Sequence, residues 1–315
     1  MAAARASTRK HKETKILDDD YPVPPPEPSS SDPSLSGDPI SHAAASPSAY
    51  PVLPPQPASS LPEDLRISWS WAHFVIFFCF SVISLLVVQT ALAIAYLPKG
   101  HPMAQKELER YLLSKPQFAI GSMLIWDLIV FLFLYITIAA LREVPFWRSL
   151  GWKKLVPTKN APGNPFLYLL AGCGLYVLVA LATATMKTPQ NAPIEDLFKF
   201  RTTAFLFMAM AVLVAPIFEE TVFRGYLYPL IGKSFGIVPG IVVTGILFGL
   251  MHGYQLGWSW RLVSVLIGVG IIFTLARAFA GTVVASFLMH LGYNSMIAIT
   301  SIIATHGFTR MPPHP

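Results

Sequence analysis

Seven long apolar stretches fill most of the chain after residue 68 and restrict the folds open to it. They cover residues 69–97, 117–141, 165–186, 202–231, 236–256, 262–279 and 282–304. An apolar helix of about 20 residues crosses the roughly 30 Å hydrocarbon core of a bilayer. The pattern therefore predicts an all-α, polytopic membrane helical bundle with about seven transmembrane helices. Six or eight stay open, because charges interrupt the fourth stretch and only a short Trp-rich turn separates the fifth from the sixth.

The composition is that of a membrane protein rather than of a soluble domain. Of the 315 residues, 53% are hydrophobic and 13% are charged, a balance typical of multispan proteins. The formal charge of +6 comes from Lys and Arg spread over the N-terminal region and the loops, so we expect membrane flanks and no nucleic-acid partner. Both cysteines, Cys79 and Cys173, lie in predicted spans, which argues against a disulfide framework or a Cys-based metal cluster.

Three regions follow from these patterns. Residues 1–66 are rich in Pro, Ser and Ala, and such a segment buries too little surface to offset its chain entropy, so we expect a disordered N-terminal tail. Residues 67–304 form the predicted membrane domain, and residues 305–315 form a short C-terminal tail. No apolar segment follows the basic start, so we expect no secretory signal peptide and interpret the first span as an uncleaved targeting element.

Positive charges between the spans bear on orientation in the membrane. Basic residues of the second loop, Arg142, Arg148 and Lys153 among them, favour a cytoplasmic N-terminus together with the basic start of the chain. Lys and Arg in the first loop oppose that orientation. Residues 145–152 are expected to form an amphipathic segment at the membrane interface, with Trp147 at headgroup level.

Ionisable side chains in the last third of the chain interrupt the apolar stretches and indicate a functional site. They form three groups: Glu219, Glu220 and Arg224; Phe248 and His252; and His290 and Asn294. Charged groups in lipid are costly, so these residues are expected to face one another inside the bundle. A helical rise of about 1.5 Å per residue puts the groups roughly 14–27 Å from the same membrane face, which allows them to converge.

The paired glutamates are expected to have different tasks. Glu220 and Arg224 are four residues apart, share a helix face and can form an ion pair. Glu219 projects about 100° away on a helix of about 3.6 residues per turn and can point into a cavity. We therefore interpret Glu219 as the working base and the ion pair as the element that holds the helix.

Two mechanisms suit these side chains. In the first, Glu219 and His252 activate a water molecule that attacks a peptide carbonyl, and His290 and Asn294 donate hydrogen bonds to the developing oxyanion. In the second, Glu219, His252 and His290 bind Zn²⁺ and leave an open position for water. The His-Glu-x-x-His zinc signature is absent from the sequence, and both mechanisms stay open at this point.

The three groups together resemble the CPBP family of intramembrane proteases, which includes the CAAX prenyl endopeptidases and the bacteriocin-processing, Abi-like proteins. The family pattern is a glutamate pair with arginine four residues after the second, then Phe-x-x-x-His, then His-x-x-x-Asn, each on its own transmembrane helix. This chain carries all three within residues 202–304. The six matching polar residues are Glu219, Glu220, Arg224, His252, His290 and Asn294.

The resemblance implies an all-helical membrane fold with a conical cavity and hydrolysis of a peptide bond in a membrane-associated, CAAX-type protein. The family is classed with metalloproteases, although a metal-free mechanism with glutamate and histidine is also argued for it. Many members are bacterial, so we expect an integral protein of the bacterial cytoplasmic membrane. Its expected partners are the lipid bilayer and a membrane-associated protein or peptide substrate.

Two other function classes stay open beside the protease. A transporter or proton relay also uses buried carboxylates and histidines, but no inverted repeat is visible and the polar groups gather in three late spans. A non-catalytic membrane scaffold would keep the fold, but it would not need complete motifs. Outside the motifs, we interpret Asp127 as a helix-to-helix hydrogen-bonding group and His73 as a packing residue.

Overall fold

The computed structural model describes residues 62–97, 104, 107, 108, 111, 112, 114–186 and 193–309, which belong to one compact unit. Within these ranges the secondary structure is helical, apart from an isolated bridge between Thr158 and Ala161. The predicted all-α fold is confirmed. Residues 1–61 and 310–315 lie outside the described residues, so the disorder expected of the N-terminal tail stays a prediction there.

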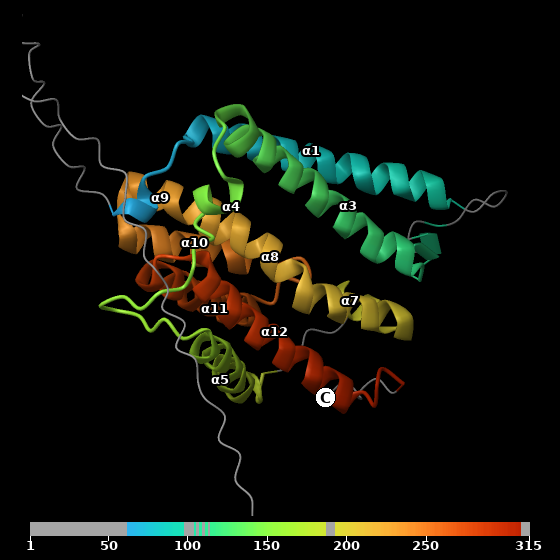
Figure 1. Cartoon of the computed structure of the whole chain (residues 1–315). Coiled ribbons are helices and arrows are strands. Elements are labelled where there is room, and N and C mark those ends of the chain that lie inside the picture. Colours follow the sequence, from blue (N-terminus) through green and yellow to red (C-terminus); the bar gives the residue numbers. More distant parts are fainter. Residues whose placement is uncertain are drawn as a thin grey trace, which may run out of the picture. The chain divides into compact units, whose positions relative to one another are not determined.

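In the described part of the chain, six helical segments are long and apolar enough to cross a membrane (Figure 1). They are α1 (Trp71–Tyr96), Ile120–Arg142, α5 (Pro165–Thr183), Arg201–Phe235, α11 (Trp260–Ala280) and α12 (Val283–Ala304). The seventh expected span is α10 (Ile237–Met251), which has 15 residues and ends at a run of turns. At about 1.5 Å per residue it is shorter than the hydrocarbon core is thick.

Shorter elements join or extend these spans. The second span consists of α3 (Pro116–Leu134), the π-helix η2 (Tyr135–Ala139) and the 3₁₀-helix η3 (Ala140–Arg142). The remaining short helices are η1 (Glu63–Leu65), α4 (Phe146–Ser149) and α6 (Pro193–Phe198). The segment expected at the interface therefore contains one short helix, α4, and loop on its C-terminal side.

The fourth predicted span, residues 202–231, is broken rather than straight. It divides into α7 (Arg201–Leu213), α8 (Ala215–Glu220), the π-helix η4 (Thr221–Leu227) and α9 (Tyr228–Phe235). Val214 lies between α7 and α8 with φ −102° and ψ −51°, and Pro216 at the start of α8 has no N–H to continue the helical ladder. The break leaves Glu219 and Glu220 in the last turn of α8, directly before a π-helix, a form that often occurs at functional sites.

Glycines bring the helices around the site close together. A Cβ added to Gly245 or Gly249 of α10 would lie 2.6 Å from the backbone nitrogen of Ile271 or Ile267 in α11. Gly292 of α12 lies equally tightly against the backbone of α5. These contacts join α10 to α11 and α12 to α5, and α12 also packs on α7, α8 and α11. Of the helices that carry the two histidines, α12 therefore packs directly on α8, and α10 packs on η4, which follows α8.

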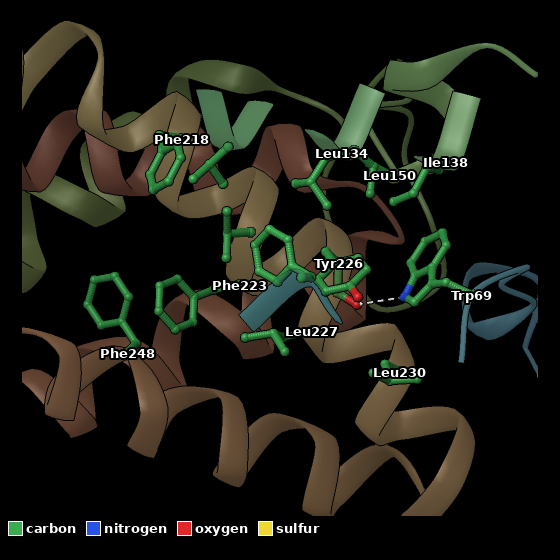
Figure 2. Packing of buried hydrophobic residues seen from close by; sticks show 13 residues of the cluster. Trp69, Leu134, Ile138, Leu150, Phe218, Phe223, Tyr226, Leu227, Leu230 and Phe248 are labelled. Carbon is green, nitrogen blue, oxygen red and sulfur yellow. Dashed lines mark hydrogen bonds between the residues drawn. The ribbon is translucent and has the colours of Figure 1, made fainter. Parts of the chain in front are cut away.

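A cluster of buried apolar side chains holds η4 in position (Figure 2). The ring of Tyr226 stacks on Trp69 at a centroid distance of 5.4 Å, and Trp69 Nε1 donates to the Tyr226 carbonyl oxygen at 3.1 Å. His73 Nδ1 lies 2.7 Å from the Tyr226 hydroxyl, in line with the packing role expected of His73. At the other end of the cluster, Phe223 packs edge-on against Phe248 of α10. The backbone that carries Arg224 is therefore fixed from two sides.

The residues just before α1 pack onto the bundle. Leu65 in η1 is 1% exposed and contacts Gly232 of α9, and it clusters with Tyr228 and Ile241. Asp64 Oδ2 pairs with Arg277 Nη1 of α11 at 3.1 Å. The composition of residues 62–66 predicts that they belong to the disordered tail. In the structure they lie against the membrane domain instead. One leucine and two carboxylates make the contacts, because Glu63 Oε1 also lies 3.1 Å from Lys153 Nζ. Three residues are too few to change the composition of the segment.

Candidate active site

The predicted ion pair between Glu220 and Arg224 is present and fully buried. Arg224 Nη1 lies 2.9 Å from Glu220 Oε1, and neither side chain is exposed. The other donors of Arg224 are satisfied by α11: Nη2 donates to the Gly270 carbonyl at 2.8 Å and Nε to Thr274 Oγ1 at 3.2 Å. The guanidinium also lies 4.4 Å from the centroid of the Phe248 ring. A buried charge pair is tolerated only when its remaining donors are satisfied in this way.

Glu220 has a second partner, His290 of α12. His290 Nδ1 lies 3.0 Å from Glu220 Oε1, the oxygen that also accepts from Arg224. An ionised carboxylate can only accept hydrogen bonds, so the proton of this contact lies on Nδ1. The opposite nitrogen, Nε2, then faces Glu219, with 3.7 Å between it and Glu219 Oε2. The Glu220 carboxylate therefore sets both the tautomer and the orientation of the His290 ring.

His252 is oriented by its own helix. It caps the C-terminus of α10, and its Nδ1 lies 2.9 Å from the carbonyl oxygen of Phe248, which again can only accept. His252 Nε2 is thus the free nitrogen, and it lies 3.9 Å from Glu219 Oε1. The Phe248 ring packs beside both imidazoles, with centroid distances of 4.9 Å to His252 and 5.8 Å to His290.

Glu219 lies between the two imidazoles. Its Oε1 is nearest to His252 and its Oε2 to His290, at distances longer than a hydrogen bond. Glu219 Oε2 is buried and accepts no hydrogen bond from any described residue. Glu220, one residue later, pairs with Arg224 instead. The two glutamates are therefore separated as the sequence predicts, one in a charge pair and one facing the histidines.

A cavity of about 470 Å³ surrounds this group inside the bundle. Its polar lining includes Glu219, His252, His290 and Asn294, together with Gln255, Thr183, Tyr293 and Ser301. Most other lining residues are apolar. Four of them, Leu262, Val265, Leu266 and Val269, follow one face of α11 at spacings of three and four residues. The cavity thus joins a polar end, formed by the motif residues, to an apolar wall.

Asn294 lines the same cavity but is already engaged. Its Nδ2 donates to the Ala211 carbonyl at 2.8 Å, in the last turn of α7 before the break at Val214. This contact ties α12 to the bend that positions α8. An amide nitrogen carries two hydrogens, so one N–H of Asn294 is left for another acceptor.

Asp127 is closer to the site than the sequence indicates. Its carboxylate in α3 makes no hydrogen bond or ion pair to another described residue, so the predicted helix-to-helix hydrogen bond is not present among them. It lies near enough to Glu219 for the two carboxyl groups to interact electrostatically. The sequence analysis also missed Thr274 and Gly270, which hold Arg224. For Thr274, a hydroxyl group in an apolar span could have indicated a buried hydrogen bond.

The donor types at the site are those of many zinc centres, but their arrangement is not. Glu219 and the Nε2 atoms of His252 and His290 form a carboxylate and two imidazoles, and each imidazole donates its other N–H to a protein acceptor, as metal-bound histidines do. Even so, no group of three His, Cys, Asp or Glu side chains within the described ranges is placed to hold a metal ion.

Comparison with known proteins agrees with the motif analysis. Residues 201–296 match the family described as type II CAAX prenyl endopeptidase, Rce1-like. The matched range contains all six candidate polar residues and starts within one residue of the resemblance inferred from the motifs. Neither a search of curated proteins nor a search of solved structures found a match.

Proposed function

We propose that this chain, whose residues 201–296 match the type II CAAX prenyl endopeptidase, Rce1-like, family, is an endopeptidase that acts within the membrane. The observation that carries the proposal is the Glu219 carboxylate, which lies 3.9 Å from His252 Nε2 and 3.7 Å from His290 Nε2 at the edge of a cavity inside the bundle. A carboxylate held beside two imidazoles can activate water and stabilise charge, which peptide hydrolysis requires.

In the proposed reaction, Glu219 takes one proton from a water molecule. His252 Nε2 accepts a hydrogen bond from the other hydrogen of this water and so orients it. The water oxygen attacks the peptide carbonyl carbon, and the carbonyl oxygen becomes an oxyanion. Glu219 then returns the proton to the peptide nitrogen, the C–N bond breaks, and a carboxylic acid and an amine result. No other reactant is needed, because the proton that leaves the water is the one that the amine receives.

The oxyanion would be stabilised from α12. Asn294 has one amide N–H beyond the one donated to Ala211. His290 can add a second donor only as an imidazolium, because its Nδ1–H is already donated to Glu220. A pair of donors at a developing oxyanion is the usual arrangement in acyl-transfer enzymes.

The substrate class we propose is a membrane-associated protein of the CAAX type. The family match supports the class, and the apolar face of α11 in the cavity suits an apolar segment or lipid group attached to the scissile peptide. The Abi-like subclass and a location in the bacterial cytoplasmic membrane stay predictions.

A Zn²⁺ ion held by Glu219, His252 and His290 is the alternative to the metal-free reaction. Bound there, the metal would supply Lewis acidity and lower the pKa of its water. Metal analysis of purified active protein, with activity measured before and after chelation, separates the two. The metal-free proposal requires full activity in metal-depleted protein, and loss of activity that Zn²⁺ restores would refute it.

The experiment that tests the hydrolase itself is cleavage of a farnesylated CAAX peptide by full-length protein in lipid nanodiscs. Glu219→Gln is expected to lower the rate by at least about a hundredfold, since it removes the base without changing side-chain size. Glu143→Gln is the matched control, because Glu143 lies in an exposed turn away from the cavity. Equal rates for Glu219→Gln and Glu143→Gln would exclude Glu219 as the base.

A further inference from the structure

A second cavity, of about 450 Å³, lies between the segment before α1, α4 and the ends of α9 and α11. We call it the basic pocket. It is lined by Glu63, Asp64, Arg66, Ile67, Val144, Pro145, Arg148, Ser149, Gly151, Lys153, Gly225, Pro229 and Arg277. None of these residues lines the cavity that contains Glu219. The basic pocket is therefore separate from the candidate active site.

The lining of the basic pocket has a surplus of positive charge. Four of the lining side chains are cationic and two are acidic. Both acids are engaged: Glu63 Oε1 pairs with Lys153 Nζ, and Asp64 Oδ2 with Arg277 Nη1, each at 3.1 Å. The hydrogen bond from Lys153 and its positive charge hold the pKa of Glu63 below its ordinary value, with smaller contributions from the other cations. Arg148 makes no ion pair with another described residue, so its charge is not offset.

One of the four cations is held at the base of the pocket. Arg277 is 1% exposed, and its Nε has no hydrogen-bond partner among the described residues. The guanidinium fits there because Gly151, at φ +80°, has no side chain: a Cβ would lie 2.8 Å from Arg277 Nη2. A guanidinium has five N–H donors, and Asp64 accepts at only one of the nitrogens of Arg277, so donors are left for a further acceptor.

The position of the basic pocket points to the membrane interface. Its rim includes Arg148 of α4, in the segment that the sequence predicts to be amphipathic and interfacial. The neighbouring Trp147 is 49% exposed, as expected of an indole at headgroup level. Basic pockets between transmembrane helices on the cytoplasmic side bind the headgroups of anionic lipids, and the charge of the second loop favours that side here.

We propose that the basic pocket binds a phosphate group whose charge is not neutralised within its own molecule. Such a group is carried by the headgroup of an anionic phospholipid or by a soluble phosphate. Arg148 and Lys153 at the rim donate to the phosphate oxygens, and Arg277 below them, paired with Asp64, offers its remaining N–H donors. The site lies apart from Glu219, so its existence does not depend on the proposed hydrolase activity.

The test is a binding titration of the full-length protein in a neutral detergent at constant ionic strength. The probes are short-chain phosphatidylglycerol and inorganic phosphate, with short-chain phosphatidylcholine as the background. The variant is Arg148→Gln with Lys153→Gln, at two rim positions whose side chains reach solvent. The control is Lys154→Gln with Lys159→Gln, which removes the same charge from the same loop at exposed positions outside the pocket.

The rim variant is expected to bind phosphatidylglycerol about twenty-five-fold more weakly than the unmodified protein, at about fivefold for each surface cation removed. The control is expected to bind as the unmodified protein does. Binding of phosphatidylglycerol alone identifies a lipid site, whereas equal binding of inorganic phosphate identifies a site for soluble anions. The proposal fails if neither probe binds above the phosphatidylcholine background, or if the rim variant and the control weaken binding equally.

Discussion

Replacement of Arg224 by methionine tests how the site is held together. The change removes three hydrogen bonds, to Glu220 Oε1, the Gly270 carbonyl and Thr274 Oγ1. It leaves the Glu220 carboxylate fully buried with His290 as its remaining hydrogen-bonded neighbour. Removal of one partner from a buried ion pair costs about 3–5 kcal/mol. For a domain of this size the melting temperature should fall by roughly 6–20 °C.

The measurement is thermal unfolding of purified protein in detergent, with two comparison variants. Arg261→Met changes an arginine at the exposed start of α11 and should shift the melting temperature little. The double variant Glu220→Gln with Arg224→Met removes both charges, so it should regain much of the stability lost in Arg224→Met alone. Two results would refute the reasoning: an unchanged melting temperature for Arg224→Met, or a double variant less stable than either single one.

Three further outcomes follow from the contacts. Gly249→Ala should destabilise the protein by about 1–3 kcal/mol in thermal unfolding, because the added methyl meets the α11 backbone. The control is Gly174→Ala, which has nothing within 4 Å of the new methyl and should have no such effect. Equal losses of stability in the two variants would contradict the packing argument. Asn294→Ala should lower kcat by about 10²–10³ if the amide binds the oxyanion, while loss of the Ala211 hydrogen bond costs only about 1 kcal/mol of stability; an unchanged kcat would leave Asn294 a purely structural clamp. Trp69→Phe should cost about 1 kcal/mol through the lost hydrogen bond to Tyr226, and a melting temperature equal to that of the unmodified protein would show that the contact does not hold η4.

Patterns that depend on composition and helical spacing could be predicted from the sequence. The spans follow from hydropathy, and the Glu220–Arg224 pair follows from the four-residue spacing that puts both side chains on one face. The separation of Glu219 from Glu220 follows from the 100° turn between successive residues. Together with the motif order, these facts were enough to predict which side chains meet.

Features that depend on the detailed backbone could not be predicted in this way. The break at Val214 and the π-helix η4 are changes in hydrogen-bond pattern, and hydropathy does not report that pattern. The Asn294 contact with Ala211 exists because that bend brings α7 to α12. The docking of residues 62–66 rests on Glu63, Asp64 and Leu65, three residues in a segment whose composition favours disorder.

The central claim is that water held by Glu219 attacks the peptide bond directly. The most direct test is a single turnover of a farnesylated CAAX peptide in H₂¹⁸O, with mass spectrometry of both the product and the protein. The account predicts one ¹⁸O atom in the new carboxyl group of the peptide and none in Glu219. Label in the protein after one turnover, or an unlabelled product, would contradict it.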